Sequence, residues 1–135
     1  GGIALATAFE ASGLSTAAAV HLAELGALPL PLLLLCLVGG IVLLSEIASN
    51  TATAVLLMPI LAATAAGIGV DPALLMFPAV LAASVGFMLP VATAPNAIAY
   101  GSGCVSNRDM LRQGAVLDLF GVLVVCAVSY VAFAN

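Results

Sequence analysis

The sequence contains little charge, and most of that charge is negative. It has no lysine, and its two arginines stand against six acidic residues, which gives a formal net charge of −4. So few basic residues exclude a nucleic-acid surface, and no nucleic-acid partner is expected. Charged residues make up 6% of the chain, against roughly 25% in soluble domains. With 64% hydrophobic residues, the chain is expected to lie in the lipid bilayer as an integral membrane protein.

Patterns typical of metal sites, disulfides and catalysis are also missing. Cys36, Cys104 and Cys126 have no CxxC spacing and no neighbouring histidine cluster, so they are expected to be small buried hydrophobic residues. No transition-metal site is predicted. An intramembrane hydrolase would need a nucleophile with a base, and His21 lies far up the chain at an expected interface. The protein is therefore not expected to be an enzyme, and no cofactor is expected.

The first 28 residues are less regular than the rest. The chain begins Gly1-Gly2-Ile3, without an initiator methionine or a basic signal region, and is expected to be a fragment of a longer protein. Residues 1–28 are expected to finish one truncated helix and to form a second helix along the membrane surface.

Apolar runs of about 20 residues predict membrane-spanning helices. Residues 73–91 and the final segment, 114–135, are long enough to cross. Asp118 is interpreted as an interfacial acid or a partner of Arg112, in preference to a proton relay. The linker 105–113 carries both arginines, which places it in the cytoplasm by the positive-inside rule.

Six polar side chains interrupt an apolar segment between residues 45 and 53. At membrane depth such groups need protein or a water-filled cavity around them, so the cluster predicts a ligand or ion site. Glu46, an acid within this cluster, is interpreted either as a functional group or as a structural acceptor that fixes the local fold.

The apolar arms on either side of the cluster, 30–44 and 52–68, each look too short to cross the membrane alone. One continuous helix over both arms would be about 58 Å long, nearly twice the hydrocarbon thickness. A re-entrant helical hairpin over residues 29–69, with its tip at 49–51, is therefore predicted.

Prolines interrupt the next segment, residues 72–104. Two prolines five positions apart remove backbone donors and disfavour helix in the residue before each. A discontinuous transmembrane helix broken at 90–96 is predicted. Thr93 or Asn96 is expected near the start of its second half, as a cap.

Ser49-Asn50-Thr51 in the hairpin and Ala92-Thr93-Ala94-Pro95-Asn96-Ala97 in the break together resemble a known family, the divalent anion:sodium symporters. These are the INDY-type carriers of dicarboxylates, citrate and sulfate. Their second repeat carries a Ser-Asn-Thr hairpin followed by a Thr-Pro-Pro-Asn-type break. Residues 1–6, 87–90 and 100–103 extend the likeness over essentially the whole chain.

The resemblance implies an all-α polytopic membrane protein, with a re-entrant helical hairpin plus a discontinuous transmembrane helix forming one half of an inverted-repeat transporter. It implies sodium-coupled symport of a small divalent anion by alternating access. Sodium is the coupling ion, and the expected location is the inner membrane of a bacterium. The implied partners are the lipid bilayer, the N-terminal repeat that this chain lacks, and a second copy in a homodimer.

The same resemblance assigns the site residues. The implied substrate-binding residues are Ser49, Asn50, Thr51, Thr93 and Pro95. The implied sodium-binding residues are Ser45, Ala48 through its backbone carbonyl, Asn50, Ala92, Thr93 and Asn96.

Two alternative functions stay open. Proton coupling or anion exchange on the same fold would suit a site in which Glu46 titrates, and the sodium dependence of uptake would separate it from symport. A structural membrane subunit would use the polar residues only as caps and helix–helix contacts. In that case replacing Asn50 or Thr93 would alter assembly without changing the affinity for any solute.

Overall fold

The computed structural model describes residues 28–133 continuously, together with residues 4, 7, 8, 11–13, 17 and 20. The two helices expected over residues 1–28, and His21 with them, lie largely outside the described residues. Within residues 28–133 the regular secondary structure is all helical. The helices are α3 (Leu30–Ile47), α4 (Asn50–Ile68), α5 (Pro72–Ala82), α6 (Ala94–Gly101) and α7 (Asn107–Phe133).

Three of these helices, α3, α4 and α7, are long and apolar enough to cross a membrane. This agrees with the predicted all-α membrane protein. By the same measure, the prediction that each hairpin arm is too short to cross is wrong, because α3 has 18 residues and α4 has 19. The added length comes from polar residues, since α3 continues through Glu46 and α4 begins at Asn50.

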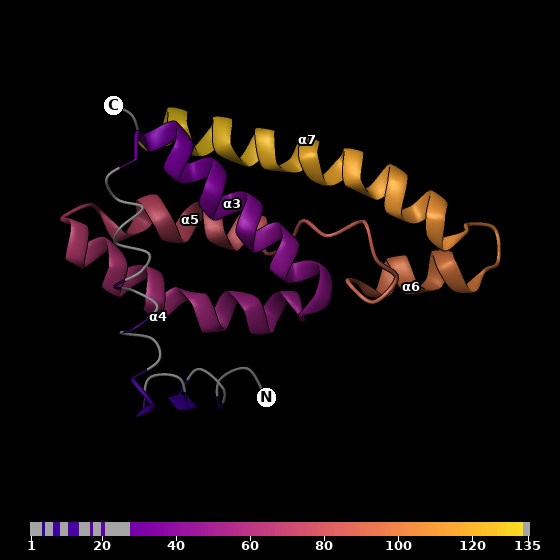
Figure 1. The fold of residues 1–135 in the computed structure, drawn as a ribbon, viewed down its shortest axis with the longest axis horizontal. Coiled ribbons are helices and arrows are strands. Elements are labelled where there is room, and N and C mark those ends of the chain that lie inside the picture. Colours follow the sequence, from indigo (N-terminus) through magenta and orange to yellow (C-terminus); the bar gives the residue numbers. More distant parts are fainter. Residues whose placement is uncertain are drawn as a thin grey trace.

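Short turns separate α3, α4 and α5. Only Ala48 and Ser49 lie between α3 and α4, which meet at this turn and diverge from it, with α5 between them (Figure 1). Gly69 ends α4 in the left-handed conformation, with φ of 73°, which glycine adopts without steric cost. Asp71 then caps α5, because its Oδ1 accepts a hydrogen bond of 2.8 Å from the backbone N–H of Ala73.

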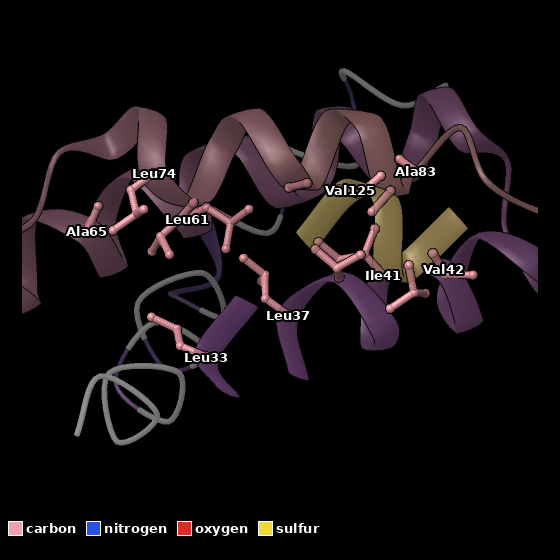
Figure 2. Close-up of a cluster of buried hydrophobic side chains, with 14 residues drawn as sticks. Leu33, Leu37, Ile41, Val42, Leu61, Ala65, Leu74, Ala83 and Val125 are labelled. Atoms are coloured by element: carbon pink, nitrogen blue, oxygen red, sulfur yellow. The ribbon is translucent and has the colours of Figure 1, made fainter. Parts of the chain in front are cut away.

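The core lies where α5 packs against α3, α4 and α7 (Figure 1). Figure 2 shows Leu37 and Ile41 from α3, Leu61 from α4, Leu74 from α5 and Val125 from α7 in this cluster. The α3 residues recur one turn apart and so occupy a single helix face. In a bilayer such a core holds helices together by close packing, because lipid is as apolar as the side chains.

The cysteines do not all lie in this core. Cys36 and Cys104 are exposed and Cys126 is half-buried, so the prediction of three buried hydrophobic residues is wrong for the first two. Leu34 and Leu37 of α3 are buried, whereas Leu35 and Cys36 between them are exposed. Cys36 therefore lies outside the helix face that forms the core.

Helix α5 is shorter than the sequence predicts. It ends at Ala82, and no α-helix is present again until α6 begins at Ala94. The predicted spanning segment 73–91 is therefore wrong beyond its first half, and the interruption is longer than the predicted 90–96. Residues 83–93 are called the break below. They run from the core toward the end of the molecule that carries the hairpin turn (Figure 1).

Helix α7 begins at Asn107, so the prediction of a loop over residues 105–113 is wrong for most of that range. A reciprocal cap explains the early start. Ser106 Oγ accepts a hydrogen bond of 3.1 Å from the backbone N–H of Asp109 and donates one of 2.6 Å to the Asp109 carboxylate. Both arginines consequently lie on the first two turns of α7, where they are exposed.

Candidate functional site

A hollow of about 470 Å³ lies where the hairpin turn meets the end of the break. In Figure 1 the turn between α3 and α4 lies near α6. The hollow joins the two segments that the sequence predicts to share one site. Its lining residues are Ile47, Ala48, Ser49, Asn50, Thr51, Val91, Ala92, Thr93 and Ala94.

Three helix ends converge on this hollow. Helix α3 ends at Ile47, whereas α4 begins at Asn50 and α6 at Ala94. The last carbonyls of a helix carry partial negative charge, and its first N–H groups carry partial positive charge. The Ser49 side chain makes no capping hydrogen bond to α4, so the first N–H groups of α4 keep their capacity to bind a ligand. The hollow is thus bordered by partial negative charge from the end of α3 and by partial positive charge from the starts of α4 and α6.

Two oxygen atoms near the hairpin turn lack partners. Asn50 Oδ1 and Thr53 Oγ1 are shielded from solvent and have no hydrogen-bond partner within the described part of the chain. Buried polar atoms without partners are rare, and each calls for an explanation. Amide and hydroxyl oxygens suit a hard cation such as sodium. Asn50 lines the hollow, so its free oxygen fits the predicted cation.

Thr53 is absent from the predicted site, although its side chain is only 2% exposed. It follows Asn50 by three positions and therefore lies on the same side of α4. That spacing is the sequence signal that could have identified it.

Thr93 both lines the hollow and begins α6. Its Oγ1 accepts a hydrogen bond of 3.3 Å from the backbone N–H of Asn96, so it acts as the N-cap. Pro95 stands at the second position of α6, is exposed, and does not line the hollow. The other residues predicted to bind substrate, which are Ser49, Asn50 and Thr51, all line it.

Ser45, predicted to bind sodium, contacts the break and does not line the hollow. It is fully buried, and its hydroxyl lies 2.8 Å from the carbonyl oxygens of both Val42 and Val85. Its single hydrogen can be donated to either carbonyl. The contact with Val85 ties α3 to the start of the break.

Asn96, the other predicted sodium ligand outside the hollow, also holds the break. Its side-chain Nδ2 donates to the carbonyl oxygens of Gly86 and Leu89, each at 3.0 Å. The residue lines a separate hollow of about 480 Å³ beside α7. The predicted sodium ligands that do line the first hollow are Ala48, Asn50, Ala92 and Thr93.

Glu46 binds the backbone of the break with both carboxylate oxygens. Oε1 accepts a hydrogen bond of 2.9 Å from the N–H of Met88, and Oε2 accepts one of 2.8 Å from the N–H of Leu89. The side chain is 2% exposed and does not line the hollow. These contacts favour the structural interpretation of Glu46. They also keep Met88 and Leu89 out of a helix, since their N–H groups bind a carboxylate instead of a helical carbonyl.

Asp118 makes the neighbouring contact from α7. Its Oδ1 accepts a hydrogen bond of 3.0 Å from the N–H of Phe87. The side chain is only 4% exposed, and no ion pair joins it to Arg112 within residues 28–133. The interpretation of Asp118 as an interfacial acid or arginine partner is therefore wrong. Asp118 is instead a buried acceptor for the backbone of the break.

Helix α7 approaches the break closely because it carries glycine there. A Cβ atom on Gly114 would collide with the Phe87 carbonyl group, and one on Gly121 would stand 2.8 Å from Val85 Cγ1. With Asp118 between them, these glycines fall on one helix face at spacings of four and three. This face is not among the predicted features, although the spacing of Gly114, Asp118 and Gly121 is readable in the sequence.

The family model described as the sodium:sulfate symporter transmembrane region matches residues 1–133. The human Na(+)/dicarboxylate cotransporter 3 is 42% identical over 123 residues, which are 91% of this chain and 20% of the relative. The sodium-dependent dicarboxylate transporter SdcS of Staphylococcus saprophyticus is 40% identical over 131 residues, 96% of this chain and 25% of the relative. SdcS of Staphylococcus aureus (strain USA300) is 39% identical over 130 residues, with the same coverage. The chain thus spans about a fifth to a quarter of the length of these relatives.

Proposed function

Because the chain belongs to the family of the sodium:sulfate symporter transmembrane region, we propose that it is part of a carrier that moves a small divalent anion together with sodium. One observation carries the proposal. The hollow is lined by three helix ends and by no ionisable side chain. A divalent anion bound there needs a positive counter-charge, and sodium supplies it. The named activities of the relatives, both sodium-dependent dicarboxylate transport, agree with this class of substrate.

The anion would lie against the N-terminal ends of α4 and α6. Both ends present partial positive charge, and free backbone N–H groups remain on the first turn of α4. The hydroxyl groups of Ser49 and Thr51 and the amide of Asn50 would donate hydrogen bonds to one carboxylate or to a sulfate. Thr93 would face them from the break.

Sodium would lie beside the anion, among oxygen atoms freed by the two helix interruptions. The proposed ligands in the hollow are Asn50 Oδ1, the carbonyl oxygens of Ala48 and Ala92, and Thr93. Ser45 and Asn96 would act by holding the break in position, because their side chains donate to its carbonyls. Cation and anion would each lower the cost of bringing the other out of water.

The contacts between α3 and the break suggest how the site would move. Glu46 and Ser45, both on α3, bind Met88, Leu89 and Val85 of the break. The hairpin turn and the break would therefore travel as one body during alternating access. The transport step would be a conformational change with no covalent chemistry.

The remaining architecture is proposed from the family. The hairpin would be re-entrant, with its tip near the midplane, and α5, the break and α6 would form one discontinuous transmembrane helix. This chain would be one of two inverted repeats, with the other repeat supplying the facing half of the site. The complete carrier would be a homodimer in the inner membrane of a bacterium.

Uptake into proteoliposomes tests this proposal. The full-length carrier, its Asn50→Ala variant and a Ser102→Ala control, whose side chain lies outside the hollow, would be assayed with radiolabelled succinate, citrate and sulfate. We expect sodium-driven uptake of one anion, strongly reduced in Asn50→Ala at the sodium concentration that half-saturates the wild type, and kept in Ser102→Ala. Sodium-independent exchange would favour the alternative coupling on the same fold. A protein that folds and moves none of the three would contradict the proposal.

A further inference from the structure

The first two turns of α7 carry both arginines of a chain that has no lysine. Arg108 and Arg112 are four positions apart, so they lie on the same face of the helix. Both are exposed, and neither side chain makes a hydrogen bond or an ion pair with any residue that the structure describes. A surface hollow of about 660 Å³ is lined by the two arginines, Asp109 and Leu111. The two guanidinium groups are therefore available to an anion from outside the described residues.

The stability of α7 does not explain an arginine at position 108. The first turn of a helix carries partial positive charge, which favours an acid there and disfavours a base. Asp109 is the acid of this turn, and its carboxylate accepts a hydrogen bond from Ser106. Arg108 stands beside it without a partner, so its charge calls for a reason outside the helix.

The length of α7 sets the depth of the arginines in a membrane. The helix has 27 residues and is long and apolar enough to cross. Residues 114–133 contain one charged side chain, the buried Asp118, and about 20 helical residues match the hydrocarbon thickness of about 30 Å. The first turns of α7, with both arginines, then extend into the polar headgroup layer, which is roughly 5–8 Å thick on each side. Lipid phosphate groups lie in this layer.

The helix face that carries the arginines continues with large apolar side chains. Leu119 and Leu123 follow Arg112 by seven and eleven positions, which places them on its face, and they are 61% and 54% exposed. The face of α7 that packs against the break instead carries glycine at its closest approaches. Helix interfaces in membranes are enriched in small residues. The bulky, exposed side chains below the arginines therefore favour contact with lipid over contact with another helix.

We propose that this face of α7 binds an anionic phospholipid, with the headgroup phosphate held by Arg108 and Arg112 and an acyl chain lying along Leu119 and Leu123. The planar fork of a guanidinium group matches phosphate oxygens in a bidentate manner. By the positive-inside rule this end of α7 faces the cytoplasm, where anionic lipids give the membrane surface a negative potential. The site is separate from the hollow at the hairpin turn, and it does not depend on the carrier's substrate.

Thermal unfolding of the purified full-length carrier in detergent tests the site. Phosphatidylglycerol or phosphatidylcholine with identical acyl chains would be titrated into the wild type and the Arg108→Gln/Arg112→Gln double variant. We expect phosphatidylglycerol to raise the unfolding temperature of the wild type more than phosphatidylcholine does. The double variant should need about thirtyfold more phosphatidylglycerol for the same effect. An Asp71→Asn control, which changes an exposed charge elsewhere, should respond as the wild type does, and inorganic phosphate should not replace the lipid.

Three results would overturn the proposal. Equal responses of the wild type and the double variant to phosphatidylglycerol would show that the arginines do not hold the lipid. Stabilisation of the wild type by inorganic phosphate alone would show a site for a free anion. In phosphatidylcholine the double variant should unfold at the wild-type temperature, and a lower temperature there would mean that the arginines bind another part of the carrier. None of these readouts requires transport, so a failure here is distinct from a failure of the proposed function.

Discussion

Gly114 lies so close to Met88 that α7 and the break leave no space for a side chain between them. A Cβ atom on Gly114 would stand 2.6 Å from Met88 Cα, a distance that real Cβ atoms essentially never show. The backbone there cannot shift easily, because Glu46 binds the Met88 N–H and Asp118 binds the Phe87 N–H. The fit of α7 against the break therefore depends on glycine at this position.

Gly114→Ala is predicted to destabilise the carrier by about 2–3 kcal/mol, in the upper range of overpacking changes. Chemical denaturation of the purified protein in detergent would measure it. Gly40→Ala is the matched control, since no described atom lies within 4 Å of a Cβ built there. That variant should be neutral or more stable by up to about 1 kcal/mol, because alanine favours helix. Equal losses in the two variants would contradict the close contact.

Glu46→Gln is predicted to lower stability by roughly 2–4 kcal/mol. It removes a buried, charge-assisted acceptor and sets an amide donor against a backbone N–H. Denaturation midpoints would show the loss. Asp71→Asn makes the same acid-to-amide change at an exposed N-cap, where asparagine serves as well as aspartate, and should be nearly neutral. A neutral Glu46→Gln would show that the break does not need this acid.

Asn50→Ala is predicted to raise the sodium concentration for half-maximal uptake at least tenfold, corresponding to about 1.4 kcal/mol of lost binding. It removes the unpartnered amide oxygen that we assign to sodium. Sodium titrations of anion uptake would measure the change, with Ser102→Ala as the control outside the hollow. An unchanged sodium dependence, with the anion affinity alone reduced, would assign Asn50 to the anion only.

Ser106→Ala is predicted to cost about 1 kcal/mol, the usual loss for an N-cap, because it removes the reciprocal bond with Asp109. Uptake per folded molecule should be unchanged, since Ser106 lies outside the hollow. Denaturation and uptake measured on one preparation would separate the two effects. A loss of uptake at normal stability would indicate that the start of α7 takes part in transport.

The sequence predicts an interruption between two helices here because its signal is local, a run of polar residues within an apolar segment. The turn itself lies at Ala48 and Ser49, and two residues of the predicted tip, Asn50 and Thr51, already belong to α4. Thr93 as the cap of α6 is likewise readable from the residues around it. The family resemblance rests on these same local motifs, and the comparisons confirm it.

What the sequence does not predict depends on contacts between distant segments. No proline marks the end of α5 at Ala82. Within the break, carboxylates from other helices take up the N–H groups of residues 87–89, and Glu46 and Met88 are 42 positions apart. The partner of Asp118, Phe87, is 31 positions away, whereas Arg112 is close in the sequence and is therefore the partner that the sequence favours. The early start of α7 is a local feature, because Ser106 and Asp109 stand at the spacing of a helix cap, and the predicted loop over 105–113 does not take it into account.

The most direct test of the central claim is an electron cryo-microscopy map of the full-length carrier in sodium and its transported anion. The account predicts anion density in the hollow, between Ser49, Thr51 and Thr93, with sodium density beside Asn50 Oδ1. Anion density elsewhere in the carrier, with this hollow closed or filled only by water, would contradict the claim that the hairpin turn and the break form the transport site.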